Sequence, residues 1–334
     1  MKKPLIIAHR GASGYRPEHT SASYRLAVEQ GADFIEPDLV STRDGHLIAR
    51  HDNVLNLTTD VASHAEFADK KTIKTVDGKK IEGWFSEDFT LAEIKTLRAV
   101  ERIPELRPAN VEYDGQFEIL TLEEIIALTQ ELEREHDRTI GLYIETKHPS
   151  YFASLGLALE VPLLEKLHAV GYDGNKAPIF LQSFEVENLK WLRAHTELAL
   201  IQLLWSSGQP ADVMLRGDSL DYDGMVTRDG LEAIARYANG VGPEKSHFLL
   251  AADDHGRLDA KNASDLVSNA HTVGLDVHAH TFRAENAFLP DALRSSDRED
   301  LPGLLEQEIL TFMELGVDGV FTDNPDIGVQ AKQR

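Results

Sequence analysis

Three acidic residues stand where expected strands would bring their side chains together. Glu36 and Asp38 are two residues apart in an expected strand over residues 33–40, so both side chains point to one face. Glu145 closes a further expected strand over residues 140–145. Buried carboxylates repel one another unless a cation neutralises them, and an all-oxygen set favours Ca²⁺ or Mg²⁺. The alternative is that either Glu36 or Asp38 faces a helix and is solvated.

Other metals and thiol chemistry are disfavoured by composition. The chain has no cysteine, which excludes disulfides, thiolate ligands and a cysteine nucleophile. Its 14 histidines show no helical pair spacing of the kind that holds zinc. A hard divalent cation is therefore a better-supported prediction for this site than zinc.

Two histidines and two basic residues lie close to these carboxylates in the expected elements. His9 ends the first expected strand, and His51 ends a return strand that follows the turn at Asp44-Gly45. A pair of histidines suits general acid–base catalysis near pH 7. Arg10 and Lys147 would supply positive charge for an anionic group, with surface salt bridges as the alternative. His280 lies on one face of a later strand, where packing is the simpler interpretation.

The elements that must position these residues alternate between strand and helix. Expected strands cover residues 5–9, 33–40, 140–145, 178–183, 198–204, 240–241, 275–282 and 318–322. Expected helices cover residues 20–30, a stretch opening at 121, and residues 152–170, 185–195, 229–238, 263–273 and 304–315. This alternation predicts an α/β fold with a parallel sheet, and eight units favour a TIM (β/α)8 barrel. The first strand is not followed by G-x-G-x-x-G, which disfavours a Rossmann fold. Active sites of such barrels lie at the carboxyl ends of the strands.

One stretch interrupts the alternation. Residues 53–117 are polar and lack long periodic runs. We interpret them as a small insertion subdomain after the second barrel strand, with residues 1–52 and 118–334 forming the barrel.

The charge of the chain restricts its partners. Its 334 residues carry 34 Lys and Arg against 56 Asp and Glu, a formal net charge of −22. A nucleic acid or an anionic membrane needs a basic surface, so neither is an expected partner. An anionic substrate would need local positive charge to overcome the global repulsion.

Long ordered motifs in the sequence resemble the glycerophosphodiester phosphodiesterases. The segments HRGASGYRPEHT from His9, EPDLVSTRDGHLIARHD from Glu36 and ETK from Glu145 carry the resemblance, and QSF and VFTDNP fit later strand ends. The resemblance covers essentially the whole chain. The insertion and the VHAHTFR segment are closer to periplasmic-type members. At His19 the chain departs from many members, which have Asn there, although some periplasmic-type members share the His.

The resemblance implies a function and roles for the site. It implies a metal site at Glu36, Asp38 and Glu145, an acid–base pair of His9 and His51, and phosphate contacts from Arg10 and Lys147. The expected activity is metal-dependent hydrolysis of a small-molecule glycerophosphodiester to sn-glycerol 3-phosphate and an alcohol, with one Ca²⁺ or, alternatively, Mg²⁺. Alternatives are a related phosphodiesterase acting on lysophospholipids, and a non-catalytic binder of glycerophosphodiesters.

Localisation and assembly are less constrained. No stretch reaches the roughly 18–20 apolar residues that span a bilayer, so we expect no integral membrane segment. The apolar run near the start is too short for the core of a signal peptide. We expect a periplasmic or secreted protein whose signal peptide has been removed, with a cytoplasmic protein as the alternative. The sequence sets no oligomeric state.

Overall fold

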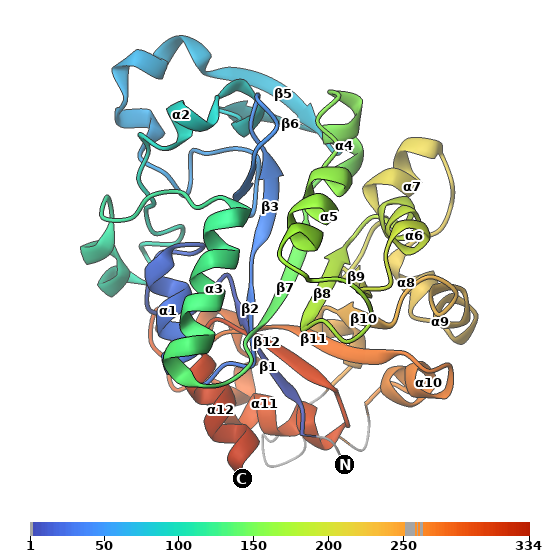
Figure 1. Ribbon diagram of the computed structural model, residues 1–334. Coiled ribbons are helices and arrows are strands. Elements are labelled where there is room, and N and C mark those ends of the chain that lie inside the picture. The colour runs from blue at the N-terminus through green and yellow to red at the C-terminus, as the bar shows by residue number, and fades with distance from the viewer. Residues whose placement is uncertain (1–2, 251–257, 259, 261–262) are drawn as a thin grey trace.

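The computed structural model describes residues 3–250, 258, 260 and 263–334, and these form a closed barrel of parallel strands (Figure 1). The barrel strands are β1 (Leu5–His9), β2 (Phe34–Glu36), β3 (Asp38–Ser41), β7 (Gly141–Thr146), β8 (Ile179–Ser183), β9 (Ala199–Leu204), β10 (Gly240–Pro243), β11 (Asp276–Phe282) and β12 (Gly319–Thr322). β1 lies between β12 and β2, and the pairing of β2 with β7 closes the sheet. Counting β2 and β3 as one position, the described residues form eight parallel strands, which confirms the TIM barrel.

The second barrel position is broken in its middle. Pro37 separates β2 from β3, and it has no backbone N–H to donate to a neighbouring strand. β2 pairs with β1 and β7, whereas β3 pairs with β7 and with the antiparallel strand β4 (Leu47–Ala49). The expected single strand over residues 33–40 is therefore two short strands. The side chains of Glu36 and Asp38 are nevertheless both buried.

Helices cover the outside of the barrel, as Figure 1 shows. They are α1 (Ser21–Glu29), α3 (Leu122–His136), α4 (Pro149–Ser154), α5 (Glu160–Ala169), α6 (Val186–His195), α7 (Ala211–Arg216), α8 (Tyr222–Met225), α9 (Arg228–Ile234), α10 (Leu266–Thr272), α11 (Leu305–Glu314) and α12 (Pro325–Gln333). Thr20 and Thr121 each close a capping box at the start of α1 and α3, which satisfies backbone N–H groups of the first turn. The centre of the barrel is filled by Ile7, Tyr143, Ile201 and Phe321.

One expected helix is wrong. Residues 152–170 form the end of α4, a linker and α5 rather than a continuous helix. Gly156 lies in this linker with φ of +73°, a left-handed conformation that glycine adopts at little cost. Helices α7, α8 and α12 were not expected from the sequence.

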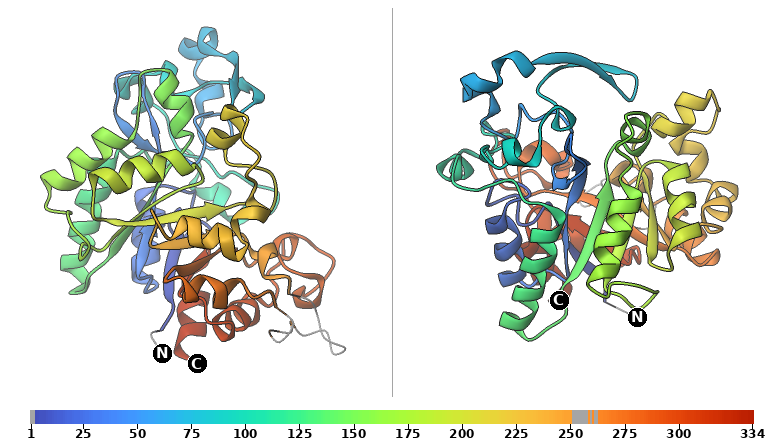
Figure 2. Two further views of the ribbon diagram at one scale, coloured as in Figure 1. Left: turned by 90° about the vertical axis from the view of Figure 1, so that its right-hand side faces the viewer. Right: turned by 45° about the horizontal axis from the view of Figure 1, so that its top comes forward.

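Residues 53–117 stand at one end of the barrel, at the top of both views in Figure 2. They contain the hairpin of β5 (Thr72–Val76) and β6 (Lys79–Gly83), the short helix α2 (Leu91–Ile94) and several 3-10 turns. Apolar side chains of this segment, including Phe67, Phe89 and Leu97, belong to the same buried cluster as those of the barrel. We propose that residues 53–117 form a small insertion subdomain that packs directly on the barrel.

No helix in the described part of the chain is long and apolar enough to cross a membrane.

Candidate active site

Strand pairing brings the expected site residues together at the carboxyl end of the barrel. His9, at the end of β1, is level with Glu36, at the end of β2. Asp38, at the start of β3, is level with Glu145, which in turn is level with Gln182 on β8. Side chains at these strand ends are therefore neighbours in space, because adjacent parallel strands lie about 4.8 Å apart.

Glu36, Asp38 and Glu145 form a buried cluster that could hold a metal ion. One carboxylate oxygen from each lies within 4.8 Å of the others. The buried Oδ1 of Asp38 has no hydrogen-bond partner. An all-carboxylate donor set with an unpartnered buried oxygen fits a hard cation such as Ca²⁺ or Mg²⁺. The alternative that either Glu36 or Asp38 is solvated on a helix-facing side is wrong, since both side chains are about 1% exposed.

The neighbours of the cluster fix two of its carboxylates. The backbone N–H of Arg10 donates to Glu36 Oε2 over 2.8 Å, and Gln182 Nε2 donates to Glu36 Oε1 over 3.1 Å. His19 Nε2 lies 2.9 Å from Asp38 Oδ2, and its Nδ1 lies 2.8 Å from the hydroxyl of Tyr24. His19 therefore orients one of the three carboxylates.

The electrostatics of the cluster favour a bound cation. Burial, then repulsion from Asp38 and Glu145, raise the pKa of Glu36 well above its ordinary value. The pKa of Glu145 rises to about 8 through burial, which outweighs the opposing charge of Lys147. Burial also acts to raise the pKa of Asp38, but Lys147 and His19 bring it well below the ordinary value. The cluster without metal thus holds protons that a cation would displace.

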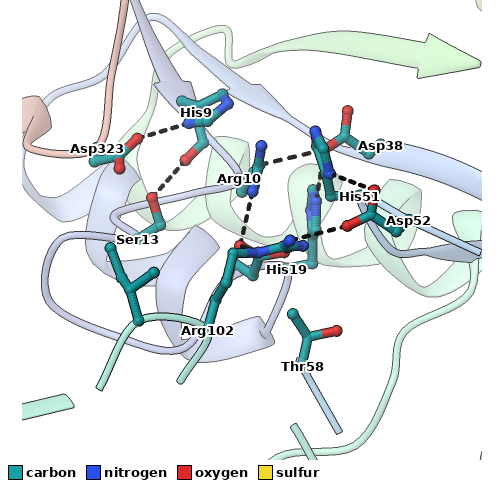
Figure 3. A network of polar contacts seen from close by, with 12 residues as sticks. His9, Arg10, Ser13, His19, Asp38, His51, Asp52, Thr58, Arg102 and Asp323 are labelled. Atoms are coloured by element: carbon teal, nitrogen blue, oxygen red, sulfur yellow. Dashed lines mark hydrogen bonds and ion pairs between the residues drawn. The ribbon is translucent and has the colours of Figure 1, made fainter. Parts of the chain in front are cut away.

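His9 has a carboxylate behind its ring (Figure 3). Its Nδ1 lies 2.6 Å from Asp323 Oδ1. Burial would raise the pKa of Asp323, yet Arg283 and Arg107 hold it well below the ordinary value, so this carboxylate is ionised. An ionised carboxylate can only accept, so Nδ1 of His9 carries the proton and Nε2 of the neutral ring is free to accept one. Burial, then Arg10, lower the pKa of His9 to about 4.

His51 also faces an aspartate, but its buried Nδ1 makes no hydrogen bond to it. Its Nδ1 lies 3.1 Å from Asp52 Oδ1, and Asp52 Oδ2 accepts a hydrogen bond from Arg102 Nη1 over 2.9 Å (Figure 3). Burial, Arg10 and Lys147 lower the pKa of His51 to about 3. Each histidine is thus neutral near pH 7 and has an aspartate on its Nδ1 side.

The two basic residues lie among carboxylates. Arg10 Nη1 donates to Glu18 Oε2 over 2.8 Å, while its buried Nε has no hydrogen-bond partner. Lys147 Nζ lies 2.8 Å from Glu145 Oε1. Both residues are less than a tenth exposed. Their positive charge is therefore concentrated at the site, where it offsets the acidity of the whole chain.

These groups open on a cavity of about 260 Å³. Five of the seven expected site residues line it, namely His9, Arg10, Glu36, His51 and Glu145. Asp38 and Lys147 lie behind this lining, in contact with it through the cluster. Beyond the acidic end, the cavity is lined by Gln182, Phe184, Leu203, Trp205, Glu244, Lys245, His280, Thr281, Arg283, Phe288 and Phe321.

His280 is a cavity residue for which the sequence favoured packing. Both of its ring nitrogens are buried without a partner in the structure. Burial, then His9 and Arg283, lower its pKa to about 3, so the ring is neutral. A buried polar group normally has a partner, and an unpartnered pair of nitrogens facing a cavity indicates a contact with a ligand or water. The sequence signal that could have indicated His280 as a site residue is its spacing of two from Phe282, which puts both side chains on one face of the strand.

A carboxylate cluster, two histidines and buried cations around one cavity of a TIM barrel are typical of an enzyme that acts on an anionic substrate. The glycerophosphoryl diester phosphodiesterase family model matches residues 9–327. The chain belongs to this family. Its enzyme class, expected from the sequence as phosphoric diester hydrolase, is confirmed.

Curated relatives match over nearly the whole chain. A glycerophosphodiester phosphodiesterase of Arabidopsis thaliana is 34% identical, over 96% of this chain and 84% of that protein. Another, from Haemophilus influenzae, is 32% identical over 98% of this chain and 89% of its own length. A solved structure of an Oleispira antarctica phosphodiesterase, in complex with the product sn-glycerol-3-phosphate, has a TM-score of 0.63 at 21% identity. It covers 99% of this chain and 98% of its own, and at this identity it shows the fold.

Proposed function

We propose that the chain hydrolyses small-molecule glycerophosphodiesters by metal-assisted catalysis with His9 and His51. The observation that carries the proposal is the convergence of Glu36, Glu145 and both histidines on one cavity. The family and the named relatives support this reaction. The products are sn-glycerol 3-phosphate and an alcohol.

The cation in this proposal is Ca²⁺, with Mg²⁺ as the alternative, held by Glu36, Asp38 and Glu145. When bound, it supplies Lewis-acid polarisation of phosphate oxygens and a template for the glycerol hydroxyls. Three carboxylates within 4.8 Å support a site for one ion. Ca²⁺ accepts irregular oxygen sets more readily than Mg²⁺, which demands near-octahedral geometry.

Arg10 and Lys147 bind the phosphate in this proposal. The Nε of Arg10 lies 3.4 Å from Asp38 Oδ2 without a hydrogen bond, so it can donate to a phosphate oxygen, and Lys147 acts as a point charge. Because both side chains are buried, their charges are poorly screened by water and strengthen in the cavity. They also explain how a chain with a net charge of −22 binds an anion.

The histidines move the protons. In the first step the glycerol 2-hydroxyl attacks phosphorus and one histidine accepts its proton at Nε2. The other histidine, which takes up a proton at Nε2 when the anionic substrate binds, protonates the leaving oxygen of the alcohol. The bond from phosphorus to that oxygen breaks, which leaves a cyclic phosphate. In the second step water attacks phosphorus and gives its proton to the histidine that acted as the acid. The histidine that acted as the base returns its proton to the ring oxygen as the bond from phosphorus to that oxygen breaks. Each histidine ends in its starting protonation state, and the sum is hydrolysis.

The far end of the cavity accommodates the alcohol. Phe184 and Trp205 meet edge to face with their ring centroids 6.0 Å apart, and Glu244 lies on the same lining. Aromatic faces beside a carboxylate suit a cationic head group such as choline or ethanolamine. We therefore propose glycerophosphocholine and glycerophosphoethanolamine as substrates. We also propose that the protein is periplasmic or secreted and hydrolyses them there.

A coupled assay for glycerol 3-phosphate release tests the proposal. Chelated enzyme is supplied with Ca²⁺ or Mg²⁺ and with glycerophosphocholine, glycerophosphoethanolamine or lysophosphatidylcholine. We expect metal-dependent release from the first two. Full activity after chelation, with no metal detected by mass spectrometry, would contradict the metal role. Near-wild-type turnover of His9→Ala and His51→Ala would contradict the histidine roles.

A further inference from the structure

Two arginines reach from residues 53–117 to the aspartates behind the proposed catalytic histidines. Arg102 and Arg107 both lie in this segment, and each contacts a different aspartate. Figure 3 shows Arg102 beside Asp52 and His51, with Asp323 behind His9 at the other side of the site. The two histidines are thus connected to the same short stretch of chain.

Arg102 connects two loops of the site. Its Nε and Nη2 donate to the two carboxylate oxygens of Glu18 over 2.8 and 2.7 Å. Its remaining Nη1 donates to Asp52 Oδ2 over 2.9 Å, and Asp52 Oδ1 lies 3.1 Å from His51 Nδ1. Arg102 therefore binds the carboxylate oxygen of Asp52 that does not face His51.

Arg107 binds the aspartate that contacts His9, as Arg102 binds the aspartate that contacts His51. Its Nη2 donates to Asp323 Oδ2 over 2.5 Å, and the other oxygen of Asp323 faces His9 Nδ1 at 2.6 Å. Its Nε donates to Glu285 over 2.5 Å, and its Nη1 donates to the carbonyl of Ser13 over 2.9 Å. Asp323 also accepts a bond from Arg283 Nε over 2.9 Å, so it has two arginine partners.

These contacts differ from ordinary surface ion pairs. The side chains of Arg107, Glu285, Asp323 and Glu18 are all less than a tenth exposed, and that of Arg102 is 19% exposed. A planar guanidinium that uses several donors at once fixes both the distance and the direction of its carboxylates. An ammonium group would supply the charge without that geometry.

We propose that Arg102 and Arg107 are positioning residues that fix His51 and His9 through Asp52 and Asp323, which makes residues 53–117 part of the catalytic machinery. The inference rests on the proposed acid–base roles of the two histidines. It goes beyond them because it assigns a catalytic purpose to the inserted segment. A merely structural role would predict lost stability without a specific loss of turnover.

The test uses Arg102→Gln, Arg107→Gln, Arg102→Lys and Arg107→Lys in the full chain. Arg98→Gln is the matched control, because Arg98 lies in the same segment and bonds the carbonyls of Lys95 and Leu97. We expect kcat for glycerophosphocholine to fall roughly 10–100-fold in the Gln variants, with KM changed less than about 3-fold. The Lys variants should recover only part of kcat, and Arg98→Gln should keep it.

A second measurement separates positioning from stability. With glycerophospho-p-nitrophenol, whose leaving group needs little protonation, residual turnover of histidine variants can be followed. Adding Arg102→Gln to His51→Ala should cost less than about 3-fold, because its effect passes through a residue already removed. Adding Arg107→Gln to His9→Ala should likewise lower turnover by less than about 3-fold. A full additional loss in these backgrounds would overturn the inference.

The remaining outcomes are also decisive. Unchanged kcat in both arginine variants, with histidine variants inactive, would overturn the positioning role and leave the proposed function intact. Active histidine variants would remove the proposed function and this inference with it. Should Arg107→Gln fail to fold because Glu285 is left unpaired, Arg107→Lys keeps the charge and gives the same test of kcat.

Discussion

His9 and Asp323, 314 positions apart in the sequence, meet at 2.6 Å between Nδ1 and Oδ1 because their strands β1 and β12 are neighbours in the closed barrel. The contact sets the tautomer of His9 and leaves Nε2 for proton transfer. An aspartate closing the last barrel strand is therefore part of the site, although an Asp at that position often only caps a helix.

Replacing Asp323 with Asn should lower kcat strongly. The amide has a donor and an acceptor end, so it no longer enforces a proton on Nδ1 of His9. Loss of an orienting aspartate behind a catalytic histidine costs on the order of 10²–10⁴-fold in turnover. Steady-state kinetics of Asp323→Asn, beside Asp300→Asn at an exposed ion pair with Arg298, checks this. Turnover within about 3-fold of wild type would exclude an orienting role.

Replacing Glu36 with Gln should weaken metal binding without unfolding the protein. The amide keeps the size of the side chain and removes one of three mutually repelling charges. We expect Ca²⁺ affinity to fall at least ~10-fold and activity to be lost, as metal sites depend on ligand charge. The melting temperature in EDTA should equal or exceed that of wild type, because a neutral amide avoids the burial and repulsion that raise the pKa of Glu36 well above its ordinary value.

Isothermal titration calorimetry and thermal melts in EDTA measure these two quantities. Glu131→Gln, on the exposed face of α3, is the matched control and should change neither. Unaltered Ca²⁺ affinity in Glu36→Gln would show that the ion, if any, binds elsewhere.

Without metal, the free energy of unfolding should pass through a maximum near pH 6.5. The folded pKa values of His9, His51 and His280 lie at about 4, 3 and 3, below the ordinary 6.5. The unfolded chain then binds more protons below pH 6.5, so stability is lost as pH falls. Glu145 has the opposite sign, since its folded pKa of about 8 exceeds the ordinary 4.5. The folded state keeps this proton, so stability falls as pH rises from about 6.5 to about 8.

Urea titrations in EDTA across this pH range measure the effect. Saturating Ca²⁺ should make the decline on the alkaline side shallower, since the cation replaces the proton of Glu145 but not that of Glu185. Glu145→Gln should make the decline shallower, which separates its contribution from that of Glu185, whose pKa burial also raises to about 8. Stability that keeps rising to about pH 8 in EDTA would contradict the raised pKa of Glu145.

The sequence was sufficient for the barrel and for much of the site. Alternating strand and helix patterns determine parallel pairing, and pairing determines which strand ends meet. Glu36 and Asp38 could be placed on one face from their spacing alone, even though Pro37 splits their strand. Their shared burial follows from a period of two, which survives a local break in hydrogen bonding.

Contacts made by irregular segments could not be predicted in this way. Arg102 meets Glu18 across 84 positions, and Arg107 meets Asp323 across 216. No periodic pattern encodes where a long connection folds back, because its path depends on tertiary packing. The wrong helix over residues 152–170 has a local cause instead, because Gly156, in a left-handed conformation, ends α4.

Removing Trp205 should change the choice of head group. Its side chain is about half exposed at the cavity, next to Phe184 and stacked near His280 with centroids 6.2 Å apart. Cation–aromatic contacts contribute about 0.5–2 kcal/mol, so Trp205→Ala should raise KM for glycerophosphocholine by about 2–30-fold. KM for glycerophosphoglycerol, which has a neutral alcohol, should change less, because the lost contact depends on positive charge.

The measurement is a comparison of kcat/KM for both substrates in wild type and Trp205→Ala. Trp191→Ala is the matched control, because Trp191 stacks on His195 in α6, outside the lining of the cavity. Equal losses for both substrates would mean that Trp205 supports the shape of the cavity rather than its charge preference. A loss confined to glycerophosphocholine ties the ring to the cation, since both substrates share the same glycerophosphoryl group and differ only in the alcohol.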